Sequence, residues 1–396
     1  MHEGLQAVLD SRQVLVFFQP VVSVERRTII GFEAYTRGGG NGAGMVKPDV
    51  LFDDALDLDL QLEIDRICRE NVLERFQDIA KKHQDVLLFL NINAKALTSS
   101  KLRAELLHEQ VHRAGLPPQR VVLELPQRQL SCGLPWTLAE LYQKHGYRFS
   151  IDDGGISPVT QEAMIRLRPD YLKLARPDPA LTQDRTLRIK LLEALREATE
   201  RTGCRVVGKG VEGEDEAFLL LDAGVVLQQG FFFTKSGGEE GDALDIFRRK
   251  IVELHTHYRE RQTAGIKAKR QAFEVLNKAA AKLAYKFSGA GREDFAALTK
   301  AVTRAMDEAQ AVFVLDDNGQ EIARGSSAAV RTDAPPCGDH SFRDYFLHLK
   351  TGFEKFCTPP FVSPCTKQRH CILAQRFFSR EGDECILGLE LRYPEA

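Results

Sequence analysis

The chain has 396 residues, of which 43% are hydrophobic, and its formal net charge is −2 at pH 7. This length predicts two or three domains with real hydrophobic cores, and the near-neutral charge gives no general support for binding to nucleic acid or to a membrane surface. No apolar run approaches the roughly 18 residues of a membrane-spanning helix, and the N-terminus lacks the features of a signal peptide, so we expect a cytoplasmic protein.

Four short apolar runs in the first part of the chain are typical of buried strands. Amphipathic stretches such as 50–82 and 138–145 alternate with them, which predicts an α/β fold, either a parallel sheet or a (β/α)₈ barrel. Polar residues at the strand ends of such a barrel are typically functional. Each run ends on a side chain that could bind a divalent metal through oxygen, and these residues are Glu33, Asn91, Glu124 and Asp152.

A long helical region is expected after the small, acidic segment 237–242. Phe247, Ile251, Leu254 and Tyr258 are spaced as one apolar face of a helix, and the same stepping recurs from Leu276 to Phe287. Gly265 lies between the two sets and predicts a break between two helices. The opposite face is basic, and a solvated face is the preferred interpretation. The apolar stripe could pack on the next domain or on a second subunit.

The last third of the chain predicts a small α+β unit. It combines a helix over 293–310, strands over 311–315 and 321–325 joined by an Asp-Asn-Gly turn, a helix over 342–351, and a hairpin over 372–378 and 385–393. The motifs FRDYF at 342–346, FVSP at 361–364 and GLEL at 388–391 resemble those of PAS or Cache sensory domains, which implies an unidentified small-molecule signal.

Cysteines are concentrated in this last third. The default expectation is reduced, mostly buried thiols, with a zinc site or a redox-active pair as alternatives, although no CxxC motif is present. The five cysteines are Cys337, Cys357, Cys365, Cys371 and Cys385, and His340 and His370 lie near them in the sequence.

Eight motifs follow one another between residues 5 and 236. They are QPVV at 19–22, GFEAYTR at 31–37, LNIN at 90–93, LELPQ at 123–127, IDDGGIS at 151–157, PDYLKLA at 169–175, VVGKGVE at 206–212 and QQGFFF at 228–233. In these motifs the chain resembles the EAL family, bacterial phosphodiesterases that open cyclic di-GMP to its linear dinucleotide. The resemblance implies a (β/α)₈ barrel and two divalent ions, such as Mg²⁺, Mn²⁺ or Ca²⁺, that activate a water for attack on phosphorus.

The resemblance also implies a role for each matching residue. One ion would be held by Glu33, Asn91, Glu124 and Asp152, the second would involve Asp153, and Lys173 would steady the attacking water or the phosphate. Lys209 occupies the position where the family has the acid that helps to take the proton from this water. An ammonium cannot accept a proton at neutral pH unless its pKa is strongly depressed. The residues expected to face the dinucleotide or its metals are Gln19, Arg37, Asp153, Lys173, Glu212 and Gln229.

Further departures from the family pattern surround the paired aspartates. Gly154 and Ile156 replace a Phe and a Thr, Gln127 replaces a Glu, and Ala175 replaces an Asp, so we interpret the barrel as a degenerate EAL domain whose loop is harder to order. Tyr35 stands in a Leu position and would alter the guanine pocket. Arg37 could still pair with a phosphate, and Lys209 could replace a metal as a fixed positive charge.

Three functions follow from this interpretation. The preferred one is a cyclic di-GMP receptor with a C-terminal sensory domain, as in the non-hydrolysing YkuI-type EAL proteins that the chain resembles. The second is a slow phosphodiesterase in which Glu212 or a metal-bound hydroxide replaces the missing base, and the third is a scaffold that binds no nucleotide. We expect an EAL domain over 1–236, a helical linker over 237–290, a sensory domain over 291–396, and a homodimer.

Overall fold

The computed structural model describes two compact units, Met1–Arg259 and Glu260–Ala396. Within them, the described residues are 3–38, 51, 57–93, 101–130, 136–155, 157–175, 184–233, 243–327, 338–363 and 366–393. Ile156, Cys337, Cys365 and the acidic segment 237–242 lie outside these ranges.

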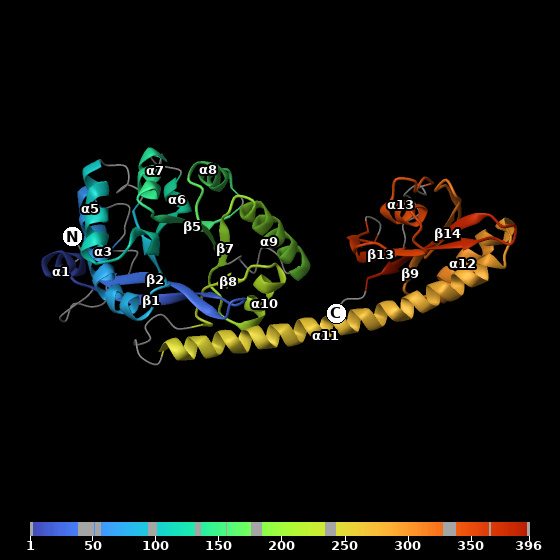
Figure 1. The fold of residues 1–396 in the computed structure, drawn as a ribbon, viewed down its shortest axis with the longest axis horizontal. Coiled ribbons are helices and arrows are strands. Elements are labelled where there is room, and N and C mark those ends of the chain that lie inside the picture. The colour runs from blue at the N-terminus through green and yellow to red at the C-terminus, as the bar shows by residue number, and fades with distance from the viewer. Residues whose placement is uncertain are drawn as a thin grey trace. The chain divides into compact units, whose positions relative to one another are not determined.

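Eight strands of the first unit close into a barrel in chain order, which confirms the predicted fold (Figure 1). They are β1 (Val14–Ser23), β2 (Thr28–Gly38), β3 (Leu87–Asn91), β4 (Val121–Pro126), β5 (Arg148–Gly154), β6 (Tyr171–Leu174), β7 (Arg205–Gly208) and β8 (Leu227–Gln228). From β2 to β8, neighbouring strands are parallel.

β1 departs from this parallel pattern because it is antiparallel to both β2 and β8. A tight turn over 24–27 joins β1 to β2, and a connection this short can only join antiparallel strands. The register of this hairpin places Gln19 directly opposite Glu33. Gln19 on β1 and Glu33 on β2 therefore lie side by side in the barrel wall.

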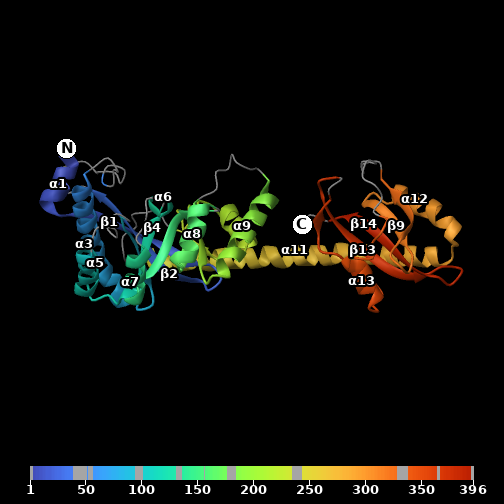
Figure 2. The same ribbon diagram turned by 90° about the horizontal axis from the view of Figure 1, so that it is seen from above.

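Helices surround the barrel, as Figures 1 and 2 show. They are α1 (Glu3–Ser11), α3 (Leu58–Lys82), α5 (Lys101–Arg113), α6 (Gln127–Leu130), α7 (Trp136–Lys144), α8 (Pro158–Arg166), α9 (Arg185–Glu200) and α10 (Glu214–Asp222), with a short 3-10 turn at Pro118–Arg120. The main core lies between strands and helices, and a second apolar cluster, which includes Val21, Phe89, Val122 and Tyr171, is formed by alternate strand residues that fill the barrel interior.

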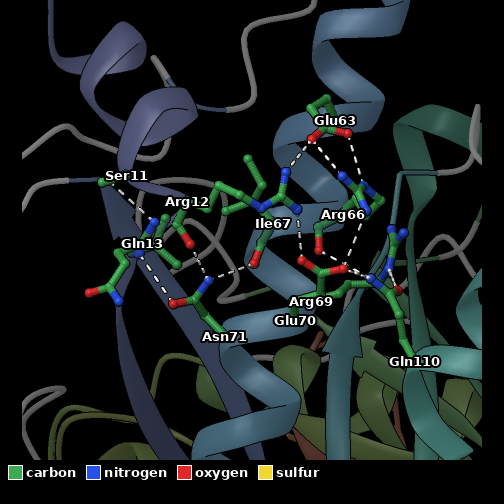
Figure 3. A network of polar contacts seen from close by, with 11 residues as sticks. Ser11, Arg12, Gln13, Glu63, Arg66, Ile67, Arg69, Glu70, Asn71 and Gln110 are labelled. Atoms are coloured by element: carbon green, nitrogen blue, oxygen red, sulfur yellow. Dashed lines mark hydrogen bonds and ion pairs between the residues drawn. The ribbon is translucent and has the colours of Figure 1, made fainter. Parts of the chain in front are cut away.

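A polar network attaches α1 to α3 (Figure 3). Arg12, just after α1, lies 2.8 Å from Glu63 and 2.9 Å from Glu70, both on α3. The side-chain amide of Asn71 donates to the backbone oxygen of Arg12 at 3.0 Å. Partly exposed ion pairs contribute little individually, so the value of this network is mainly to fix where the first helix meets the barrel.

The second unit is a six-stranded antiparallel sheet with helices on its faces. The strand order is β10–β9–β14–β13–β11, with β12 also paired to β13. The strands are β9 (Ala309–Leu315), β10 (Glu321–Ser326), β11 (Lys355–Cys357), β12 (Phe361–Val362), β13 (Arg369–Phe378) and β14 (Glu384–Arg392), and the helices are α12 (Phe295–Ala305), preceded by a 3-10 turn at Arg292–Asp294, and α13 (Asp344–Lys350). The turn at 316–319 joins β9 to β10 as predicted, with Gly319 at φ 83°.

Two sequence expectations for this region are wrong. The helix α11 runs without interruption from Ala243 to Ser288, so Gly265 does not break it. A single interior glycine costs a helix only about 1 kcal/mol, which 46 residues of helix easily outweigh. The helix predicted over 293–310 ends at Ala305, because β9 takes Ala309 and the residues after it.

Candidate functional site

The polar side chains predicted at the strand ends do gather at one end of the barrel. Glu33 lies on β2, Glu124 on β4, and Lys173 on β6, and Asn91 is the last residue of β3. Glu33, Glu124 and Lys173 are buried, with 1%, 0% and 0% of their surface exposed. Charged side chains are almost never buried to this extent unless they are paired.

Lys173 provides that pairing by bridging two carboxylates. Its Nζ lies 2.6 Å from Oε2 of Glu33 and 2.7 Å from Oε1 of Glu124. The side-chain amide of Asn91 donates to Oε1 of Glu33 at 3.1 Å, and that of Gln229 donates to Oε2 at 2.7 Å. Glu33 is therefore fully surrounded by donors, whereas Oε2 of Glu124 has no hydrogen-bond partner among the described residues.

The two carboxylates consequently differ in protonation. Burial is the largest single effect and opposes ionisation of Glu33, but the positive charges of Lys173 and Lys209 and the hydrogen bonds to Glu33 together outweigh it and lower the pKa of Glu33 to about 2. Burial raises the pKa of Glu124 to about 8, and repulsion from Glu33 adds to the increase. At pH 7, Glu33 is a carboxylate and Glu124 mostly retains its proton.

A second lysine bridges the paired aspartates. Nζ of Lys209 lies 2.6 Å from Oδ1 of Asp152 and 3.0 Å from Oδ1 of Asp153. Lys209 follows β7, and its backbone N–H donates to the oxygen of Leu174 at 3.1 Å. Burial favours the neutral amine, but Asp152 and Glu33 reverse this effect and raise the pKa of Lys209 above its usual value. Lys209 thus remains an ammonium at neutral pH and has no lone pair to accept a proton.

The hydroxyl of Tyr35 joins this cluster, a contact that the sequence analysis missed. It lies 3.3 Å from Oε1 of Gln19 and 3.2 Å from Nε2 of Gln229, and Gln229 also donates to Gln19 at 2.9 Å. Burial together with the negative charge of Glu33 raises the pKa of Tyr35, so the hydroxyl keeps its proton. A leucine at this position would leave the two glutamines without that partner.

Arg37 lies beside the cluster, not within it. Its Nη1 donates to the backbone oxygen of Thr36 at 2.9 Å. Together with Tyr35, Asn91 and Arg69, it lines a cavity of about 220 Å³ next to the strand ends. The lining includes Tyr35 and Asn91 of the cluster but none of its carboxylates, and the guanidinium of Arg37 on this wall is suited to pair with an anion.

Glu212 occupies an exposed position just before α10. Its backbone N–H donates to Oε2 of Glu216 at 2.7 Å. Asp153 is also largely exposed, with 62% of its side chain accessible. Glu212 and Asp153 are therefore the predicted site residues most exposed to solvent. The remaining predicted residues, apart from Arg37, form the central cluster: Gln19, Glu33, Asn91, Glu124, Asp152, Lys173, Lys209 and Gln229.

The substitutions around β5 have local explanations. Gly154 is buried, and a Cβ at this position would overlap Cδ1 of Leu172. The glycine therefore leaves room for the Leu172 side chain, and loop flexibility is not its only effect. The amide of Gln127 donates at 2.7 Å to Oγ of Ser157. That oxygen also accepts from the backbone of Thr160 at the start of α8, so Gln127 still anchors this segment without a carboxylate.

The two metal positions that the family resemblance implies differ in how well their residues fit a divalent ion. Lys209 already supplies the positive charge between Asp152 and Asp153, so these carboxylates do not fit a second divalent ion. At the other position Lys173 also bridges Glu33 and Glu124, but Oε2 of Glu124 has no partner among the described residues and suits one hard cation. In the described part of the chain, however, no group of three or more His, Cys, Asp or Glu side chains is arranged to hold a metal.

A closed barrel of eight strands, parallel from β2 to β8 and surrounded by helices, places the protein in the class of α/β-barrel proteins. Within that class, the EAL domain model matches residues 2–236, and the chain belongs to the EAL family. Two similar curated proteins from Escherichia coli are the probable cyclic di-GMP phosphodiesterases PdeB, 24% identical over 59% of this chain, and PdeD, 22% identical over 57%. The chain spans only 45% and 42% of their lengths.

Two solved structures share the fold. Bacillus subtilis YkuI, an EAL protein solved with cyclic di-GMP and calcium, matches over 99% of both chains with a TM-score of 0.76 and 16% identity. The EAL domain of Xanthomonas citri FimX, solved with cyclic di-GMP, covers 60% of this chain and 93% of its own, with a TM-score of 0.52 and 20% identity. The match to YkuI thus includes both units. No helix among the described residues has the length and apolar character needed to span a membrane.

Proposed function

We propose that this protein is a cyclic di-GMP receptor that binds the dinucleotide at the strand ends of its barrel without rapid hydrolysis. The observation that carries the proposal is the position of Lys209, whose ammonium lies 2.6 Å from Asp152 and 3.0 Å from Asp153. The family resemblance expects an acid and a second divalent ion at this place. A fixed cation can attract a phosphate, but it cannot remove a proton from water.

Binding would use the residues that remain. Arg37 on the cavity wall would pair with one phosphate, Lys209 would face another, and Gln19 and Gln229 would offer polar groups to the nucleotide. One divalent ion would be held by Glu33, Asn91, Glu124 and Asp152, and it would supply further positive charge toward phosphate oxygens. The binding of cyclic di-GMP and calcium by YkuI supports this assignment by analogy of fold.

A slow phosphodiesterase is the second candidate, because the chain keeps most of the family's charged residues. Glu33, Glu124 and Lys173 are buried in one contact network, and the buried Asp152 lies 2.6 Å from Lys209. The exposed Glu212 or a metal-bound hydroxide would then act in place of the missing base. Loss of a general base costs about two to four orders of magnitude in rate, so turnover would be detectable only over long times.

We assign the remaining parts of the chain on the same basis. The receptor domain would comprise 1–236, the helical linker 237–290, and the C-terminal sheet domain 291–396, a PAS- or Cache-like unit that senses a small molecule. A homodimer in the cytoplasm would be the functional form. The match of YkuI over both units supports this layout.

Calorimetric titration of cyclic di-GMP into the full chain, with and without Ca²⁺ or Mg²⁺, tests the proposal. Chromatography of the same mixtures for linear dinucleotide separates the two candidates. Micromolar or tighter binding without product supports the receptor. Rapid product formation would overturn it, and an absence of binding under every metal condition would leave a scaffold that takes no nucleotide.

A further inference from the structure

Two cysteines of the C-terminal unit lie on neighbouring strands. Cys357 is the last residue of β11, which forms one edge of the sheet, and Cys371 lies on β13, the strand paired with it. The antiparallel register sets Cys357 opposite Leu373, two residues along β13 from Cys371. Because strand residues two apart point to the same face, the two thiols share one side of the sheet.

Packing supports this proximity. Cys371 belongs to the apolar cluster on that face, and Cys357 packs against the same cluster. The thiols are also close enough for each to shift the pKa of the other. The Sγ of Cys357 also lies 3.6 Å from the backbone oxygen of Thr358.

The two thiols differ in accessibility, which gives them different chemical roles. Cys371 is fully buried, whereas Cys357 is only partly buried at the sheet edge. Interaction with the Cys371 thiol lowers the pKa of Cys357, against the opposing effect of burial. The same interaction raises the pKa of Cys371, and burial adds to this effect. Cys357 is therefore the sulfur that an oxidant can reach and that carries thiolate character.

The geometry points to a redox site that nothing in the EAL barrel requires. We propose that Cys357 and Cys371 form a reversible intrachain disulfide in response to low-molecular-weight disulfides such as oxidised glutathione, with Cys357 attacking first and Cys371 resolving.

The exchange balances in two steps. The thiolate of Cys357 attacks one sulfur of the low-molecular-weight disulfide, which forms a mixed disulfide and releases one thiol after protonation. The sulfur of Cys371 then attacks Sγ of Cys357, loses its proton to solvent, and releases the second thiol. The protein loses two protons and two electrons, and the small disulfide gains both.

The position of Cys357 allows the bond to close. Diagonal residues on paired strands are about 7–8 Å apart at Cα, which is slightly longer than most disulfides accept. Because Cys357 ends a three-residue edge strand, only the end of β11 must shift to close that gap. Cys385, by comparison, is buried on β14, and burial raises its pKa to about 11, so it should remain a thiol.

The test uses the full chain, reduced and then equilibrated with glutathione at increasing ratios of oxidised to reduced form. We expect two thiols per chain to disappear together without dimer formation on a non-reducing gel. Tryptic mapping should then find peptide 356–367 linked to peptide 370–376. Because Cys365 lies in the first peptide, the mapping is repeated in the Cys365→Ser variant, which should give the same link.

Single variants separate the two steps. Cys371→Ser should stop at a mixed disulfide on Cys357, Cys357→Ser should lose the reaction, and Cys385→Ser should behave as the unmodified chain. Far-ultraviolet circular dichroism checks that each variant folds. A disulfide between any other cysteines, or two free thiols at 357 and 371 under about a thousandfold excess of oxidised glutathione, would overturn the proposal.

Discussion

The ammonium of Lys209 lies 2.6 Å from Oδ1 of Asp152, and the two side chains are 18% and 11% exposed. This ion pair places a positive charge at a point of the barrel where several carboxylates would otherwise repel one another. Replacing that charge by a negative one should therefore change the stability of the protein, its metal binding and its rate of hydrolysis. Each of these three effects has its own measurement.

Lys209→Glu should destabilise the metal-free protein by about 2–4 kcal/mol, because Asp152 loses its partner and gains a negative neighbour. Added Mg²⁺ or Mn²⁺ should restore much of this stability, because three acids now face a common space. The readout is the melting temperature with and without the ion. Release of linear dinucleotide should also increase, by roughly a hundredfold if only the base was missing.

Lys190→Glu is the matched control for that charge change, since Lys190 forms an exposed pair with Glu193 on α9. It should leave both the metal response and the rate unchanged. A stabilising effect of Mg²⁺ on Lys209→Glu without any gain in turnover would indicate that the segment after β5 also limits hydrolysis.

Lys173→Met should cost about 3–5 kcal/mol of unfolding free energy, because it leaves the ionised Glu33 buried without its cation and removes the partner of Glu124. Denaturant titration measures the loss. Lys190→Met, which removes an exposed pair, should change stability by less than about 1 kcal/mol. Equal effects of the two variants would mean that the buried bridge contributes no more than a surface ion pair.

Tyr35→Phe should weaken cyclic di-GMP binding by about three- to tenfold, because the hydroxyl helps to hold Gln19 and Gln229 in one arrangement. Calorimetry gives the dissociation constants. Tyr285→Phe, at a side chain on α11 that is 83% exposed, serves as the control. Tighter binding by Tyr35→Phe would show that the hydroxyl competes with the ligand for the glutamines.

Calcium binding should strengthen as pH rises toward 8, because Glu124, with a pKa of about 8, must lose its proton before it can hold a cation. Below that pH each metal bound should release a proton, and the affinity should fall by up to about tenfold per pH unit. Titrations in two buffers with different ionisation enthalpies measure the released proton. Glu124→Gln should abolish this pH dependence, and if it persists, another group is responsible.

The short apolar runs predicted the barrel, and because parallel strands bring their ends to one place they also predicted that Glu33, Asn91 and Glu124 lie near one another. Lys173, Gln19 and Gln229 were expected beside them only from the family resemblance. The contact of the Tyr35 hydroxyl with Gln229 could not be assigned in the same way, because it depends on how the barrel closes between β1 and β8.

The continuous helix through Gly265 and the contacts of His340 and His370 depend on helix stability and strand pairing, which the residue pattern alone does not reveal. Gly265 predicted a helix break, yet the surrounding helix tolerates it. His340 and His370 were grouped with the cysteines from their spacing. In the folded sheet they contact carboxylates instead, His340 at 3.2 Å from Glu321 and His370 at 2.7 Å from Glu390. Antiparallel pairing brings these partners together from distant parts of the chain.

The backbone of Asp153 has φ 53°, in the left-handed region that is costly for residues with a side chain. A sequence optimised only for this backbone would place glycine there and gain about 1 kcal/mol. It would also lose the carboxylate that lies 3.0 Å from Lys209. The barrel mouth thus carries a local conflict between backbone conformation and the ion pair with Lys209, and redesign of this chain for thermal tolerance should leave position 153 unchanged.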